Sequence, residues 1–175
     1  MTVLRGLPPI VGERAEVLIL GSFPSAASLA AGQYYAHPRN QFWRILGAIL
    51  AQPLCDMDYA AKQAAVMAAG LAIWDVYAQC ERVGSLDAAI RNGMLNDFAS
   101  LRKSAPALRR VCFNGRAAGR FAPQLAALGL ETRLLPSTSP AHAGWSLERK
   151  LAAWMEGLDY GCRRVAETIR PSASA

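Results

Sequence analysis

The sequence predicts an α/β fold, a three-layer α/β/α sandwich around a four-stranded parallel sheet. Short, nearly continuous apolar runs are typical of strands that are buried on both faces. Segments with apolar residues at helical spacing separate these runs, and strands that alternate with helices form parallel sheets through right-handed crossovers. The predicted strands are 17–21, 71–76, 110–113 and 132–135, and the predicted helices are 40–51, 59–70, 95–103, 116–128 and 146–166.

The predicted elements alternate in order along the chain. The strand VLILG is followed by the helices NQFWRILGAILA and YAAKQAAVMAAG, and each later strand precedes one helix, the last helix being the longest. Each helical segment repeats apolar residues with a period near 3.6, which places them on one face. The connection between 21 and 40 is much longer than the roughly 2–6 residues of an ordinary strand-to-helix loop. Long loops at a sheet edge often belong to an active site.

Length and composition indicate one globular domain. The chain has 175 residues, of which 53% are hydrophobic and 18% are charged. Domains usually have about 100–200 residues, so we expect one domain over 1–170 and a disordered Ser/Ala-rich tail over 171–175. The first residues lack the apolar region of a secretory signal, and no apolar stretch is long enough to span a bilayer. We therefore expect a cytoplasmic protein with no membrane partner.

Charge and motif content narrow the possible ligands. The net charge is +6, and residues 102–133 carry seven basic groups and one acidic group. Such a stretch suits a phosphate-bearing partner, although a solvated helix face is an equal alternative. The four cysteines form no CxxC pair, which excludes the common zinc and iron–sulfur patterns. The GxGxxG and GxxxxGK[ST] motifs of nucleotide-binding loops are also missing. We expect neither a metal nor a cofactor.

The segment after the first strand, GSFPS at 21–25, carries groups that suit a flat anionic ligand. In parallel sheets, ligands bind outside the carboxyl ends of the strands. Backbone N–H groups of this turn can receive an anionic oxygen, and Phe23 can stack on a flat ring. An ordinary tight turn is the alternative interpretation.

Two further segments and one carboxylate are candidates for the same edge of the sheet. One segment precedes a predicted helix, and the other segment and the carboxylate lie at the ends of predicted strands. Residues 34–43 (YYAHPRNQFW) combine aromatic, basic and amide groups; Asn40 fits a helix N-cap, and Phe42 and Trp43 suit the core. Residues 137–142 (STSPAH) offer three hydroxyls and an imidazole, which either grip phosphate oxygens or cap the final helix. Asp75 is the carboxylate best placed for acid–base chemistry, because it ends an apolar strand.

Taken together, these segments resemble the uracil-DNA glycosylase superfamily. The likeness is to its mismatch-specific uracil/thymine branch and to the related DNA-deoxyinosine (hypoxanthine) glycosylases. It rests on LGSFPS at 20–25, AHPRNQFW at 36–43, FNGR at 113–116 and PSTS at 136–139, which occur in the expected order. One such match is weak, but four in order are specific.

One departure separates the two branches. In the mismatch-specific branch, the third residue of the first motif is an asparagine that positions the hydrolytic water, whereas this chain has Phe23 there. The hypoxanthine-type enzymes are similar to this chain in having GSFPS, and the resemblance then implies that Asn40 is catalytic. Asp75 stands where relatives place a base-contacting or water-orienting residue. The resemblance therefore favours hypoxanthine as the substrate and keeps uracil or thymine as the alternative.

The resemblance also implies roles for the remaining residues. The base-binding group is Gly21, Ser22, Phe23 and Tyr35; the residues at the DNA phosphates or the wedge are Ser25, Ser137, Thr138, Ser139, Ala141 and His142. Ala141 is small for a wedge that fills the vacated stack, so His142 or Trp145 is the alternative. The expected partner is double-stranded DNA that contains a deaminated base, bound by a monomer.

We expect a monofunctional enzyme that leaves an abasic site. Glycosylases that also nick the strand need an amine nucleophile, and the three lysines, Lys62, Lys103 and Lys150, lie outside every motif.

Two other classes remain open. A flavodoxin-like (SGNH-type) esterase would use Ser22 or Ser25 with His142 as its base, but the orienting Asp before this histidine is missing. A non-catalytic protein that recognises damaged bases would bind DNA without cleaving it.

Overall fold

The computed structural model describes residues 2–159, and its central element is a parallel sheet. Its strands are β2 (Val17–Gly21), β3 (Leu71–Asp75), β6 (Arg110–Asn114) and β7 (Glu131–Leu135). They are ordered β3-β2-β6-β7, and every neighbouring pair is parallel. The predicted four-stranded parallel sheet is therefore confirmed, with strand ends within one residue of the predicted ones.

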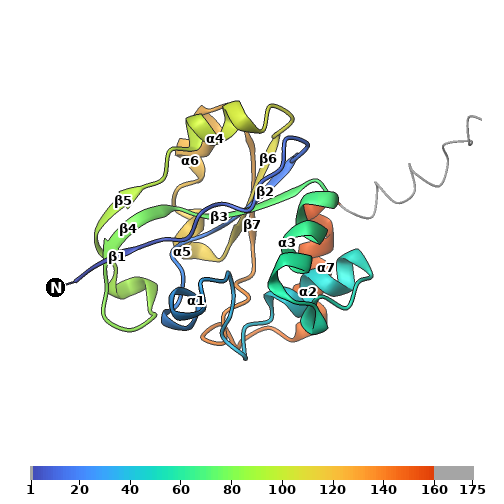
Figure 1. The fold of residues 1–175 in the computed structure, drawn as a ribbon, viewed down its shortest axis with the longest axis horizontal. Coiled ribbons are helices and arrows are strands. Elements are labelled where there is room, and N and C mark those ends of the chain that lie inside the picture. The colour runs from blue at the N-terminus through green and yellow to red at the C-terminus, as the bar shows by residue number, and fades with distance from the viewer. Residues whose placement is uncertain (1, 160–175) are drawn as a thin grey trace, which may run out of the picture.

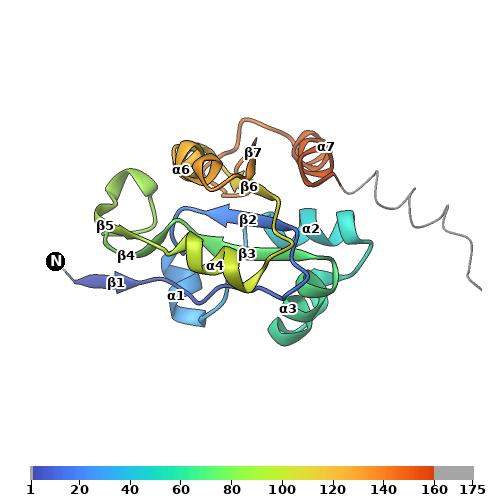
Figure 2. The ribbon, with the colours of Figure 1, turned by 90° about the horizontal axis from the view of Figure 1, so that it is seen from above.

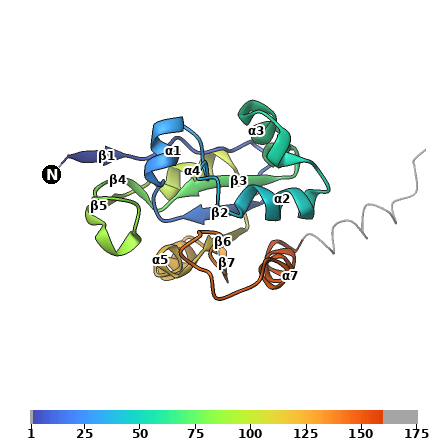
Figure 3. The same cartoon turned by 90° about the horizontal axis from the view of Figure 1, so that it is seen from below.

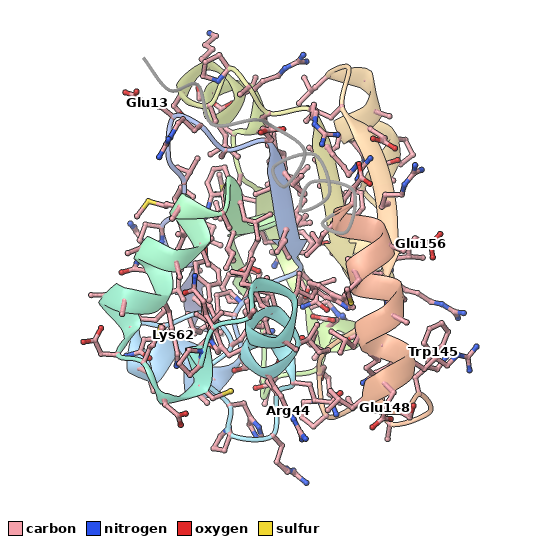
Figure 4. The ribbon with its side chains drawn as sticks, turned by 90° about the vertical axis from the view of Figure 1, so that its right-hand side faces the viewer. Glu13, Arg44, Lys62, Trp145, Glu148 and Glu156 are labelled. Atoms are coloured by element: carbon pink, nitrogen blue, oxygen red, sulfur yellow. The ribbon has the colours of Figure 1, made fainter. Side chains whose placement is uncertain are left out.

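Helices cover both faces of this sheet (Figure 1). One layer consists of α2 (Phe42–Leu50), α3 (Tyr59–Ala68) and α7 (Leu147–Leu158), and the other of α4 (Phe98–Ser104), α5 (Arg116–Gly119) and α6 (Ala122–Ala127). Alternate residues of β2 point into different cores: Val17 and Ile19 pack with the first layer, and Leu18 and Leu20 with the second. Each fully buried side chain of this kind stabilises the fold by about 1.5–3 kcal/mol. Figure 4 shows the first layer lying over the strands, with Arg44 and Glu156 at its outer surface.

A second sheet, which the sequence did not predict, adjoins the first. It is antiparallel, with β1 (Val3–Arg5), β4 (Tyr77–Glu81) and β5 (Arg91–Leu95) in the order β1-β4-β5. The three strands lie together at the end of the molecule away from α7 (Figure 2). All five residues of β5 are exposed, so this strand lacks the apolar pattern by which the others were recognised. Because β4 begins just after β3, the hairpin 77–95 lies at the carboxyl end of the parallel sheet.

Several helix predictions need correction. The connection 21–40 contains a short helix, α1 (Ala26–Ala31), capped by the Ser25 hydroxyl, which accepts from the backbone N–H of Ser28. The predicted helix 116–128 is two helices, and Pro123 lies in the first turn of the second. The predicted helix 95–103 starts later, at Phe98, because its first residue belongs to β5. The structure also has two short 3-10 helices, η1 (Leu54–Asp56) and η2 (Asp87–Ala89).

The end of the chain lies outside the described residues. Residues 160–166 of the last predicted helix and the predicted tail 171–175 both fall there. Between residues 2 and 159, every helix is too short or too polar to cross a membrane.

The strand order places a binding crevice between β2 and β6. The chain leaves β2 for β3 on one side of it, and later enters β6 on the other side. Sheets of this type bind ligands where the order reverses, outside the carboxyl ends of the strands. This edge faces the viewer in Figure 3, where α1 and the loop between β7 and α7 border it.

Candidate active site

One pocket at this edge collects residues from every motif that the sequence singled out. Its lining combines strand ends, the segment before α2, the loop after β7 and the β4–β5 hairpin. The lining residues are Gly21, Ser22, Phe23, Pro24, Ser25, Ser28, Tyr34, Tyr35, Asn40, Asp75, Ser85, Asp87, Asn114, Ser137, Thr138 and Ser139. Of the predicted site residues, only Ala141 and His142 lie outside this lining.

Gly21, Asp75 and Tyr35 meet at the bottom of the pocket. Gly21 pairs with Asp75 across β2 and β3, and a Cβ at Gly21 would lie 2.4 Å from Asp75 Oδ1 and 3.2 Å from the Tyr35 hydroxyl. A side chain at position 21 would therefore displace both polar groups. The Tyr35 ring stacks on Phe42, with centroids 3.9 Å apart, and its φ of 56° is in the left-handed region. Tyr35 lines the pocket, and sparsely populated backbone conformations of this kind cluster at functional sites.

Asp75 is a buried carboxyl group with an unusual environment. Only 4% of the residue is exposed, and Oδ2 has no hydrogen-bond partner among the described residues. Burial raises the pKa of Asp75 to about 7; nearby Asp87 also raises it, and Arg82 lowers it. Burial likewise raises the pKa of the Tyr35 hydroxyl, so this group stays neutral. The pocket therefore holds a carboxyl group that changes its charge near neutral pH.

The hairpin residues Arg82, Ser85 and Asp87 contact the first motif and hold it in place. The Ser22 hydroxyl donates to Asp87 Oδ1 at 2.5 Å, and the backbone N–H of Ala26 donates to Ser85 Oγ at 3.0 Å. The Arg82 guanidinium lies 5.1 Å from the centroid of the Phe23 ring. Sequence reasoning missed all three hairpin residues, because no motif marks them and only the tertiary fold brings them to the site.

Asn40 lies in the pocket and is fixed by its own helix. Its Oδ1 accepts from the backbone N–H of Phe42 at 2.9 Å, and its backbone N–H donates to the His37 carbonyl at 2.9 Å. The N-cap of α2 is Gln41, so the predicted cap position is wrong by one residue, although the Asn40 side chain does satisfy an N-terminal amide. Within the described residues, Asn40 Nδ2 donates no hydrogen bond and remains available to a ligand. Phe42 and Trp43 are buried, as predicted.

Asn114 and Thr138 form a reciprocal pair across β6 and the loop after β7. Asn114 Nδ2 donates to Thr138 Oγ1, and the Thr138 backbone N–H donates to Asn114 Oδ1, both at 2.9 Å. Thr138 is fully buried, and its contacts orient Asn114; its predicted contact with phosphate stays a prediction. Asn114 is a pocket residue that sequence reasoning did not select, although the FNGR motif contains it. Asn114 also interacts with the Tyr35 hydroxyl, whose pKa it lowers, and its second Nδ2 hydrogen lies at the pocket.

The loop after β7 presents hydroxyl groups that are bound to its own backbone. Ser137 Oγ accepts from the Ser139 N–H at 3.2 Å, and Ser139 Oγ accepts from the Ala141 N–H at 3.3 Å. Both hydroxyls keep their own proton to donate. Ala141 is exposed, and His142 is half-buried with no partner at Nε2 among the described residues. The ring of Trp145 lies under the Arg149 guanidinium at 3.7 Å, near the start of α7 (Figure 4).

Lys150, a residue outside every motif, joins two of the motif segments. Its ammonium group donates to Gln41 Oε1 at 2.9 Å and to the His142 carbonyl at 2.8 Å, and only 2% of the residue is exposed. The Gln41 backbone N–H also donates to the Thr138 carbonyl at 3.0 Å. These three hydrogen bonds fix the spacing between the segment before α2 and the loop after β7, which run side by side in Figure 1.

We expect Lys150→Met to slow catalysis about tenfold, because small misplacements of reacting groups have effects of this size or larger. Methionine keeps the buried chain length but removes both hydrogen bonds to the two segments. Single-turnover rates and thermal unfolding of Lys150→Met and of the exposed control Lys103→Met would test this. Equal rates in both variants would show that the link between the two segments is not needed.

Among the described residues, the pocket offers neither a metal-ligating cluster nor a nucleophile–histidine pair. Residues 2–159 contain no group of three His, Cys, Asp or Glu side chains able to hold a metal ion. The Ser22 hydroxyl bonds to Asp87, and the Ser25 hydroxyl bonds to Ser28, so neither serine is activated by His142 as an esterase requires.

Comparisons with known proteins agree on one family. The family model of the uracil DNA glycosylase superfamily matches residues 8–157. A hypoxanthine DNA glycosylase of Methanosarcina acetivorans is 41% identical over 148 residues, which cover 85% of this chain and 94% of the relative. Another from Methanosarcina barkeri is 39% identical over 154 residues, covering 88% and 97%. The solution NMR structure of a Methanosarcina acetivorans protein superimposes with a TM-score of 0.81 and 38% identity, covering 91% of this chain and 99% of the other.

Proposed function

Because this chain belongs to the uracil DNA glycosylase superfamily, we propose that it is a monofunctional glycosylase that removes hypoxanthine from double-stranded DNA and leaves an abasic site. The substrate assignment is supported by two relatives that are named hypoxanthine DNA glycosylase. The observation that carries the proposal is that Phe23 and Asn40 line one pocket at the reversal point of the sheet. We propose that the protein acts as a monomer in the cytoplasm.

The pocket suits a base that has been rotated out of the duplex. Extrusion of a nucleotide costs a few kcal/mol, and less for a mispaired base such as hypoxanthine. In the proposed complex, the base stacks on Phe23 next to Gly21, whose lack of a side chain lets Asp75 and Tyr35 approach the pocket. Tyr35 would contact the base from the same part of the lining, since its hydroxyl lies close to Gly21.

Asn40, Asn114 and Asp75 would act on the glycosidic bond and the leaving base. The sugar gains positive charge and the base gains negative charge as this bond breaks. Donors that are already fixed in place stabilise such charge at little cost in reorganisation. Asn40 Nδ2 and the remaining Asn114 N–H are donors of this kind, and neutral Asp75 adds an O–H. Asn40 also has the reach to orient the water that attacks the sugar.

The hydroxyls of Ser137 and Ser139 would hold the DNA backbone. Both can donate to phosphate oxygens, and half or more of protein–DNA hydrogen bonds go to the backbone. The Ser25 hydroxyl, which caps α1 and bonds to Ser28, would contact phosphate as an additional group after it exchanges its bond to Ser28. Ala141, His142 or Trp145 would fill the space that the extruded base leaves.

Cleavage of defined duplexes tests the proposal. Duplexes that carry one hypoxanthine, uracil, thymine or xanthine opposite each normal base are incubated with the protein and then treated with alkali. We expect the fastest strand breakage at hypoxanthine, with breakage only after alkali, and no covalent complex with DNA on borohydride reduction. Faster cleavage at uracil or thymine would support the mismatch-specific alternative, and binding without cleavage at any base would contradict the proposal.

A further inference from the structure

Arg82 is a buried cation that forms no ion pair among residues 2–159. Only 6% of the residue is exposed, and Nη2 donates to the carbonyl oxygen of Pro24. Its Nε and Nη1 atoms are buried and have no hydrogen-bond partner among the described residues. None of the ion pairs among the described residues involves Arg82. Buried arginines are usually paired with a carboxylate, so the retention of this unpaired charge calls for another explanation.

The Arg82 charge has two neighbours at the pocket, the ring of Phe23 and the carboxyl group of Asp75, whose pKa it lowers. The guanidinium carbon lies 5.1 Å from the ring centroid, within the range of a cation–π interaction. Phe23 and Pro24 both line the pocket, whereas Arg82 does not. A base bound in the pocket is therefore separated from the Arg82 guanidinium by the ring of Phe23, and the positive charge acts on the base across this ring.

We propose that Arg82 is a positioning residue that fixes Phe23 and places positive charge behind the ring on which the departing base stacks. This inference rests on the proposed function. The base is nearly neutral before the glycosidic bond breaks and gains negative charge as it breaks. A positive charge in a site without water therefore stabilises the transition state more than the bound substrate, which raises the rate of the chemical step.

Single-turnover cleavage of a hypoxanthine duplex over a range of enzyme concentrations tests this inference. The half-saturating concentration reports DNA binding, and the limiting rate reports the chemical step. We expect Arg82→Gln to lower the limiting rate about tenfold, as for loss of a desolvated cation–π contact, with nearly unchanged half-saturation. Arg82→Lys keeps the charge and should retain most of the rate. The matched control is Arg91→Gln, an exposed arginine of the same hairpin that bonds only to nearby carbonyl groups.

A double-mutant cycle with Phe23→Leu separates a charge effect from a folding effect. If Arg82 acts through the ring, Arg82→Gln should cost much less in the Phe23→Leu protein than in the wild type. Arg82 also lowers the pKa of Asp75, so its loss changes the protonation of this carboxyl group. Comparing the rates below and above pH 7 separates that effect from the effect on Phe23.

Three results would overturn the inference: Arg82→Lys as slow as Arg82→Gln, equal losses with and without the ring, or a limiting rate for Arg82→Gln equal to that of the control. If the wild type cleaves no duplex, the proposed function itself fails, which is a distinguishable outcome.

Discussion

Asn40→Ala is expected to slow base release by a factor of about 10²–10³, the usual effect of removing one fixed donor at a developing charge. DNA binding should remain, because Asn40 is one of many residues that contact the nucleotide in the proposed complex. Single-turnover cleavage of a hypoxanthine duplex and a separate binding titration measure the two effects. A non-catalytic DNA-binding protein would instead show no cleavage in either form.

Asn40→Asp is the matched control for the structural role of this side chain. Asn40 Oδ1 accepts from the Phe42 N–H at the start of α2, and loss of such an interaction costs about 1 kcal/mol of stability. Aspartate keeps this acceptor but has no N–H to donate. We expect Asn40→Asp to be as stable as the wild type and as slow as Asn40→Ala. Full activity of Asn40→Asp would show that the amide donor is unimportant.

The rate of base release is expected to be constant below about pH 7 and to fall above it, because Asp75 has a pKa of about 7. A charged Asp75 would repel the negative charge that develops on the base, so the protonated form is the active one. Asp75→Asn should lower the plateau rate about 10²-fold, since it cannot transfer a proton, and should abolish the fall above pH 7. A rate that instead rises through pH 7 would identify Asp75 as a general base.

The same titration predicts a gain in stability for Asp75→Asn. In the unfolded chain Asp75 ionises near its ordinary pKa of 3.8, and in the folded chain near 7. The folded state thus binds the proton more tightly, and the free energy of unfolding falls as pH rises between these values. Above pH 7 the buried charge destabilises the wild type by a few kcal/mol, at about 1.4 kcal/mol per unit of pKa. Denaturant unfolding above pH 7 should therefore show Asp75→Asn to be the more stable protein.

The control for both measurements is Asp56→Asn, at an exposed carboxylate that does not line the pocket. It should change neither the pH profile of the rate nor the free energy of unfolding. If Asp75→Asn and this control have the same free energy of unfolding above pH 7, the charge on the buried carboxylate does not destabilise the fold.

The parallel sheet could be predicted because its strands carry their signal locally. β2 and β3 are apolar over nearly every residue, which only strands covered on both faces require. The ends of these strands then identified the edge at which Gly21, Asp75 and Asn40 meet.

The residues that support the site could not be found in this way. β5 is exposed throughout, and its pairing with β4 depends on backbone contacts between distant segments. Arg82 and Asp87 come from that hairpin, and Lys150 comes from a helix far from its partners in sequence. Their roles depend on tertiary contacts, for which residue type and spacing carry no signal.

Lys150 belongs to α7, whereas both of its partners belong to earlier segments. On the ribosome, all strands and every motif of the pocket emerge before this helix does. A nascent chain that already displays each motif therefore lacks the link that sets the spacing of its DNA-facing segments. Maturation of the active site therefore waits for the synthesis of α7.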